Sequence, residues 1–197
     1  MEFDEVIKKR RSVRSFLDKK PAWKDVLEAI DFSSQGPFAG NHNNIKFLII
    51  ENKDMLRELS NLAGQLWISE SQIAVLVCSD DTNLENIYGE RGRVYSRQQA
   101  GATITTFLLK LVDLGLSACW VGSYDDLIVK QKLKIPENVQ IEAIIPIGYA
   151  DETKNVSKVN KKSLESSLFW ENWGESRRMS LFEEDHKDIA PLGDYNR

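Results

Sequence analysis

The sequence has few of the residues that enzymes use for acid–base, nucleophilic or metal chemistry. It contains only two histidines and two cysteines in 197 residues. His42 lies in a polar loop and His186 in a charged tail, and neither is near a recognisable nucleophile motif. A hydrolase with a catalytic triad is therefore not indicated. If the protein is an enzyme, we expect a bound cofactor to carry the chemistry.

The cysteine pattern also argues against a zinc site or a disulfide framework. Cys78 and Cys119 sit inside the apolar runs AVLVCS and SACWVG, and neither belongs to a C-x-x-C or Cys/His spacing. A free cysteine in such surroundings behaves as a small apolar residue. We predict two buried free thiols and no metal site.

Long apolar runs and a strong net charge are absent too. No stretch approaches the roughly 20 apolar residues that cross a bilayer, and MEFDEVIKKRRS lacks the apolar core of a signal peptide, so a cytoplasmic location is expected. The net charge of −4 and the pI near 5.4 provide no long-range attraction for nucleic acid or anionic lipid. The length and the 42% hydrophobic content fit one globular domain.

Apolar periodicity predicts that helices and buried strands alternate along the chain. Helical spacing is found in residues 3–12, 24–34, 55–64 and 125–135, and most extensively from Ala100 to Leu111, with a glycine stop at Gly115. Continuous apolar runs at 46–51, 73–79, 117–123 and 143–149 predict strands. The class is α+β or α/β with a central sheet.

Three guanidinium groups and a hydroxyl fall within five residues at the end of the first predicted helix. They belong to Arg10, Arg11, Ser12 and Arg14. Guanidinium binds phosphate through two parallel hydrogen bonds, and a hydroxyl adds a further donor. A single phosphate is thus a plausible ligand. A solvated basic surface, or a nucleic-acid patch together with the two preceding lysines, is the alternative interpretation of this cluster.

Two further segments contain small residues where a ligand could approach the backbone. The first is the loop Pro37, Phe38, Ala39, Gly40 and Asn41, in which the Asn amide can both donate and accept. The second is Val121, Gly122 and Ser123, at the carboxyl end of an apolar strand and before a helix. A turn beside a core tryptophan would explain the second segment equally well. Neither is a Rossmann fingerprint, because no G-x-G-x-x-G follows a strand.

Taken together, these segments resemble the nitroreductase family of flavoproteins, over nearly the whole chain to about Trp173. The family's R-R-S-x-R motif matches the basic cluster, and its P-S-x-x-N-x-Q-P-W segment is similar to residues 37–45. Asn43, Asn44 and Ile45 replace the family's Gln, Pro and Trp in that segment.

The most specific likeness lies in the second half of the chain. The family's central helix and G-L-G-x-C-W-x-G strand are similar to residues 88–126, and its L-G-Y-x-x-E ending resembles IPIGYADE. Gln99 stands where the family commonly has Asp, and Thr106 where it commonly has Asn. Lys161 and Lys162 open a segment that looks like the family's basic R-K-P-L-E element.

The resemblance implies an α+β fold with a central, mostly antiparallel sheet flanked by helices, in an intertwined homodimer that holds FMN between two chains. It implies one domain over residues 1–173, with residues 174–197 as a tail that packs on the partner. Arg10, Arg11, Ser12 and Arg14, helped by Lys161 or Lys162, are expected to bind the FMN phosphate and ribityl chain. The 37–41 loop is expected at the edge of the isoalloxazine ring, the backbone of 121–123 at its face or N5 side, and Gln65 nearby.

The implied activity is a ping-pong reduction of nitroaromatics, quinones or similar small acceptors by NAD(P)H, and it requires no catalytic side chain. Within the same fold, a dehalogenating or flavin-degrading enzyme or a deazaflavin-like cofactor is an alternative. From other classes, a flavin sensor or carrier without turnover and a basic-patch nucleic-acid binder also stay open, although the acidic total disfavours the latter. Neither membranes nor nucleic acid are expected as partners.

Overall fold

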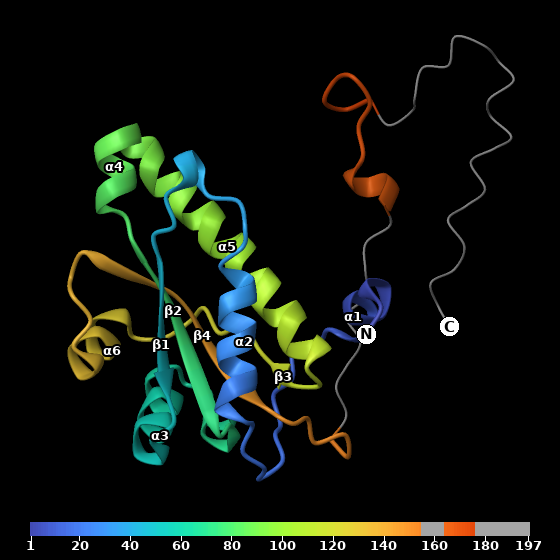
Figure 1. Ribbon diagram of the computed structural model, residues 1–197, viewed down its shortest axis with the longest axis vertical. Coiled ribbons are helices and arrows are strands. Elements are labelled where there is room, and N and C mark those ends of the chain that lie inside the picture. Colours follow the sequence, from blue (N-terminus) through green and yellow to red (C-terminus); the bar gives the residue numbers. More distant parts are fainter. Residues whose placement is uncertain (155–163, 176–197) are drawn as a thin grey trace, which may run out of the picture. The chain divides into compact units, whose positions relative to one another are not determined.

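The computed structural model describes residues 1–154 and 164–175 (Figure 1). The chain divides into two units, Met1–Val156 and Ser157–Arg197, each of which is described by itself. The first unit contains α1 (Phe3–Lys9), α2 (Trp23–Ser33), the 3-10 helix η1 (Ala39–Asn41), β1 (Ile45–Ile50), α3 (Lys53–Leu62), η2 (Leu66–Glu70), β2 (Ile73–Asp80), α4 (Thr82–Tyr88), α5 (Glu90–Asp113), β3 (Ser117–Ala118), α6 (Asp126–Leu133) and β4 (Val139–Gly148). The described part of the second unit contains η3 (Leu164–Ser167).

The four strands form one sheet in the order β1-β2-β4-β3, and every neighbouring pair is antiparallel. The two central strands, β2 and β4, come from the continuous apolar runs, because a strand covered on both faces has no solvent side. The predicted α+β class with an antiparallel sheet is confirmed. None of the helices in the described residues combines the length and the apolar character needed to span a membrane.

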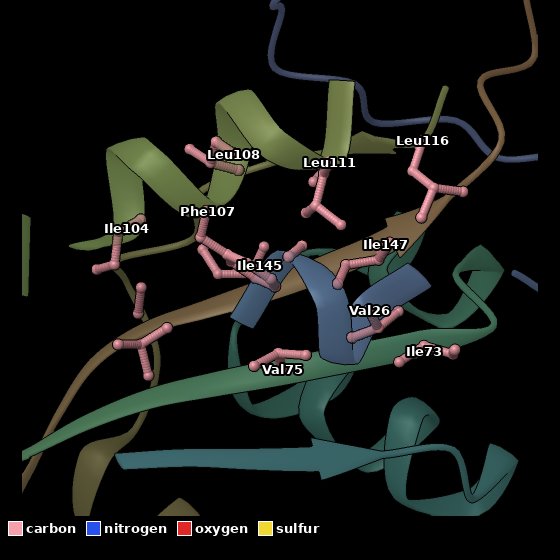
Figure 2. Close-up of a cluster of buried hydrophobic side chains, with 14 of the residues drawn as sticks. Val26, Ile73, Val75, Ile104, Phe107, Leu108, Leu111, Leu116, Ile145 and Ile147 are labelled. Carbon is pink, nitrogen blue, oxygen red and sulfur yellow. The ribbon is translucent and has the colours of Figure 1, made fainter. Parts of the chain in front are cut away.

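Helices cover both faces of this sheet, and alternate residues of each strand point to opposite faces. Val75 of β2 and Ile145 of β4 pack with Phe107 of α5 on the face covered by α2 and α5 (Figure 2). Leu76 and Ile144, their neighbours in sequence, belong to the second core cluster, beneath α3 and α6. The core therefore has one layer on each face of the sheet, and α5 belongs to the layer that it shares with α2.

Three details differ from the sequence prediction. Helix α5 begins at Glu90, whereas apolar periodicity marks it only from Ala100, and α4 carries no such pattern. The predicted strand at 117–123 is regular only at Ser117–Ala118. The helical spacing in residues 3–12 comes from Phe3, Val6 and Ile7, which would share one apolar side of α1, but Phe3 and Ile7 are exposed and only Val6 is buried. The predicted stop of α5 at Gly115 is confirmed, since this residue has φ +76° and follows the C-cap Leu114.

Asp80, at the end of β2, is hydrogen-bonded to the first residue of α4. Its Oδ1 accepts hydrogen bonds from the N–H (3.1 Å) and the hydroxyl (2.7 Å) of Thr82. The hydroxyl bond is the main reason why the pKa of Asp80 lies below its ordinary value. From one residue before the N-cap Asp81, this carboxylate satisfies the free N–H group of the first residue of the helix, as a capping side chain does.

We expect Asp80→Ala to lower the free energy of unfolding by about 1 kcal/mol at neutral pH, the usual loss for a removed helix cap. Because the folded-state pKa is lowered, the contribution is present above the ordinary pKa of 3.8 and is lost as the pH falls through the folded value. Urea unfolding at pH 7 and below pH 3.8 measures the difference, with Asp80→Asn as the control that retains an acceptor oxygen. Equal midpoints for wild type and Asp80→Ala at pH 7 would contradict this role.

Candidate functional site

The basic segment runs along the edge of the sheet where β3 and the end of β4 meet. The N–H of Val13 donates to the carbonyl of Ala118 (3.1 Å), and Phe16 forms a bridge with Ala150. Val13 and Phe16 are buried, whereas Ser12 and Arg14 are exposed. Because side chains alternate along an extended backbone, Ser12 and Arg14 lie on the side opposite Val13.

The guanidinium groups of this segment have no partner within the described residues. The side chains of Arg10, Arg11 and Arg14 form no ion pair or hydrogen bond with residues 1–154 or 164–175. By contrast, Arg93 pairs with Glu85, and Arg97 pairs with Asp81 and Glu142. Three unneutralised guanidinium groups within five residues are available to an external anion.

Two contacts that the sequence did not reveal hold this segment in place. Oε2 of Glu70 accepts from the hydroxyl of Ser15 (3.2 Å) and from the N–H of Phe16 (3.3 Å). The ring of Phe16 lies against Gly148, where a Cβ atom would be 2.8 Å from Cδ1 of that ring. Gly148, the glycine of the IPIGYADE segment, therefore leaves the space into which Phe16 of the basic segment packs.

The loop of residues 37–41 is folded into η1 over the N-terminal half of α5. The N–H of Ala39 donates to Oε1 of Gln99 (2.7 Å). Gly40 has φ +57°, and a Cβ atom there would lie 2.6 Å from the hydroxyl of Tyr88. Asn41 also has a positive φ, +60°, and its side chain is exposed. The backbone conformation thus depends on glycine and on an Asn that tolerates the left-handed region.

The segment at 121–123 offers a different surface. Both backbone groups of Val121 are bonded to Ile144 (3.0 Å each), so they are not available to a ligand. Gly122 and Ser123 are exposed, and their N–H groups make no bond within the described residues. A Cβ atom at Gly122 would meet only Nε1 of Trp120, at 3.9 Å. The free donors and the open backbone of this segment therefore belong to Gly122 and Ser123.

Gln65 follows the end of α3. It is half-buried at the start of η2, and its N–H donates to the carbonyl of Ser60 (3.0 Å). The carbonyl of Leu62 accepts from the N–H of Asp125 (3.1 Å), which brings the end of α3 to the start of α6. The bond joins Asp125, two residues after Ser123, to Leu62, three residues before Gln65. Lys161 and Lys162 lie outside the described residues.

Within one chain, the 37–41 loop lies far from the basic segment. The loop is bonded to Gln99, whereas the amino group of Met1, in front of α1, pairs with Asp113 at the last position of α5 (2.7 Å). Fourteen residues separate Gln99 from Asp113, which corresponds to about 20 Å of α-helix. Figure 1 shows the same arrangement, with the α2–β1 loop beside α4 and α1 beside the opposite end of α5.

A hollow of about 340 Å³ borders the loop, but it contains no residue of the basic segment or of 121–123. It is lined by Asn41, His42, Asn43, Asn44, Lys46, Asp80 and Asn83. A second hollow, of about 290 Å³, is lined by Phe16 and Glu70 among others, and it too contains no residue of 10–14 or of 121–123. Neither of these hollows joins the two groups of predicted site residues.

The cysteines do not take part in this surface. Cys78 and Cys119 are free and buried, as the sequence predicts. Burial, followed by the charge of Glu142, raises the pKa of the Cys78 thiol to about 11. A thiol with such a pKa is almost entirely protonated at neutral pH and is a poor nucleophile.

Comparison with known proteins gives a consistent match. A family model described as the nitroreductase family matches residues 7–149. A protein of Methanothermobacter thermautotrophicus, provisionally named NADH dehydrogenase/NAD(P)H nitroreductase, is 29% identical over 157 residues, which are 77% of this chain and 79% of the relative. The iodotyrosine deiodinase of Thermotoga neapolitana is 24% identical over 166 residues, 76% of this chain and 89% of the relative.

Solved structures share the fold. The solved structure of an FMN-dependent nitroreductase from Clostridium difficile R20291 superimposes with a TM-score of 0.71 at 20% identity. The match covers 85% of this chain and 98% of that one. At this level of identity the likeness shows the fold alone.

Proposed function

Because the chain belongs to the nitroreductase family, we propose that it is an FMN-dependent oxidoreductase that takes hydride from NAD(P)H. The observation that carries this proposal is the group of three guanidinium groups around Ser12 that have no partner among the residues that the structure describes. When bound, FMN would supply the redox chemistry, receiving hydride from the nicotinamide and reducing a nitroaromatic, quinone or similar small acceptor in a ping-pong cycle.

The exposed basic segment fits the phosphate end of such a cofactor. Arg10, Arg11 and Arg14 can each offer a fork of N–H donors, and Ser12 adds a hydroxyl. Since none of the arginines is paired within residues 1–154 and 164–175, phosphate binding breaks no described ion pair. We propose that a lysine at 161 or 162 adds further positive charge.

The open backbone at 122–123 fits the ring. A flat ligand can approach Gly122 closely, because no side chain of the described residues crowds its Cα. The N–H groups of Gly122 and Ser123 are unbonded there and can donate to a ring atom that gains negative charge. We propose that Gln65 lines the same region. No acidic or basic side chain is required for hydride transfer, and we assign none.

The separation of the two predicted halves supports a homodimer. A loop about 20 Å along α5 from the basic segment can serve a site of that kind only if a second copy supplies one half. We propose that residues 37–41 of one chain face the basic segment of the other, that residues 1–173 form the domain, and that residues 174–197 pack on the partner. The cytoplasmic location stays a prediction.

The deiodinase among the relatives favours a second candidate, a flavin enzyme that reduces halogenated aromatics. The basic segment and the backbone of residues 122–123 would hold the flavin in both cases. The two candidates therefore differ only in the acceptor, and measured turnover with a quinone, a nitroaromatic and an iodinated phenol would distinguish them.

We expect the purified protein to be yellow, to take up FMN, and to lose its visible absorbance anaerobically when NADH or NADPH is added. Steady oxidation of NAD(P)H with an added quinone should follow. A flavin carrier would instead show at most one turnover, and uptake of a deazaflavin in preference to FMN would identify the other cofactor. A colourless protein that binds no FMN would reject the proposed function.

A further inference from the structure

Gln99 is a buried polar residue of α5 that contacts both ends of η1. Its side chain belongs to a residue that is only 4% exposed. Oε1 accepts from the N–H of Ala39 (2.7 Å), and Nε2 donates to the carbonyl of His42 (3.2 Å). Nε2 also donates to Oδ1 of Asn44 (2.9 Å). One amide therefore bonds the chain on both sides of the Gly40-Asn41 turn.

The residues behind Gln99 hold it in a fixed position. Nδ2 of Asn44 donates to the hydroxyl oxygen of Ser96 (2.7 Å), and the hydroxyl of Ser96 donates to Oδ1 of Asp81 (2.5 Å). Nη2 of Arg97 donates to Oδ2 of Asp81 (2.5 Å). Asn44, Ser96 and Asp81 are buried, so these bonds are shielded from water and each depends on the next.

The turn that Gln99 bonds needs such support. Gly40 and Asn41 both have positive φ, and a left-handed conformation at a residue other than glycine is sparsely populated and persists only where its surroundings enforce it. An amide can accept from Ala39 through its oxygen and at the same time donate to His42 through its nitrogen, without carrying a charge into the interior.

We infer that Gln99 is a positioning residue, which fixes the 39–42 turn in the geometry that receives the flavin ring of the partner subunit's site. This inference rests on the proposed function. A carboxylate at position 99, as the resembled family commonly has, would accept from Ala39 but would face the carbonyl of His42 with no proton to donate. The amide is thus a feature of this chain's own loop, in which Asn43 and Asn44 also depart from the family pattern.

The test compares flavin binding by Gln99→Glu and Gln99→Leu with binding by Thr105→Val. Thr105 lies on the same helix, is exposed, and bonds only the carbonyl of Gly101, so its replacement should leave binding unchanged. FMN and riboflavin are titrated separately, because riboflavin has the ring but no phosphate. Both Gln99 variants should raise the Kd for FMN and for riboflavin by about tenfold, the loss of a buried hydrogen bond or more.

Arg14→Ala provides the opposite pattern, since it should weaken the binding of FMN, which carries the phosphate, far more than the binding of riboflavin. Equal wild-type affinity in a folded Gln99→Glu protein, or a loss confined to FMN, would overturn the positioning role while the proposed function stands. A wild-type protein that binds neither flavin would overturn both. If the Gln99 variants do not fold, Ser96→Ala removes the support one step behind. It should raise both Kd values about threefold, and no change there would equally overturn the inference.

Discussion

Replacing Gly92 with alanine is expected to lower the free energy of unfolding by about 3 kcal/mol, the upper part of the range for overpacking a closely packed contact. Gly92 is buried in the first turn of α5, where that helix crosses α4. A Cβ atom there would lie 2.3 Å from the carbonyl oxygen of Leu84 and 2.6 Å from the nitrogen of Glu85. Both are backbone atoms, so no side-chain rotation relieves the clash and α4 must move.

Gly101→Ala is the matched control, because Gly101 lies on the same helix and a Cβ atom there would meet nothing within 4 Å. Within one chain, this substitution should stabilise the helix by up to about 1 kcal/mol. Urea unfolding of both variants measures the difference. A loss of stability at Gly101 would indicate that a second copy covers this side of α5, whereas an unchanged Gly92→Ala protein would refute the close crossing of α4 and α5.

The sequence predicted well those parts of the fold in which every residue is buried and is therefore apolar. The runs that became β2 and β4 are apolar throughout because both faces of these strands are covered. The early turns of α5 were not predicted, since ion pairs there replace an apolar stripe. Arg93 reaches back to Glu85 of α4, and Arg97 to Asp81. Such pairs between neighbouring elements leave no periodic pattern in the sequence.

The candidate site divides in the same way. The basic cluster could be predicted from the sequence, because its four phosphate-binding side-chain types occur within one short segment. Glu70 and Gln99 could not, because each acts on a backbone group more than fifty positions away in the chain. Their role depends on which loop the fold brings over them. A single polar residue between apolar neighbours gives no sign of its partner.

The largest expected effect on function is the loss of FMN binding in two variants, each of which damages one half of the proposed site. Arg11→Ala with Arg14→Ala removes two charged donors, and at about 1.5 to 3 kcal/mol each should weaken FMN binding by more than about 100-fold. Gly40→Val places a branched side chain at φ +57°, where even a Cβ atom would lie 2.6 Å from the Tyr88 hydroxyl. Each variant alone should be almost colourless.

Co-expression of these two variants should restore flavin binding if the site is shared. In a mixed dimer, the loop of the arginine variant meets the intact basic segment of the Gly40→Val chain, while the other site carries both defects. With random pairing, half of the dimers are mixed and one of their two sites is intact, so about a quarter of all sites should bind FMN with wild-type affinity. Differently tagged chains allow the mixed dimer to be purified, which raises the expected occupancy to about one half.

The control is co-expression of the arginine variant with Arg10→Ala,Arg14→Ala, in which both defects fall in the same half. No mixed dimer of that pair can contain a wild-type basic segment, so no site with full affinity should form. Absence of recovery in the purified first pair would mean that the loop and the basic segment do not meet across two chains. Recovery of FMN binding is therefore expected only for the pair in which one chain is changed in the basic segment and the other in the 37–41 loop. These two parts lie about 20 Å apart in one chain and serve different sites of the dimer. That outcome follows because α5 is too rigid a spacer for one copy to bring both halves to one flavin.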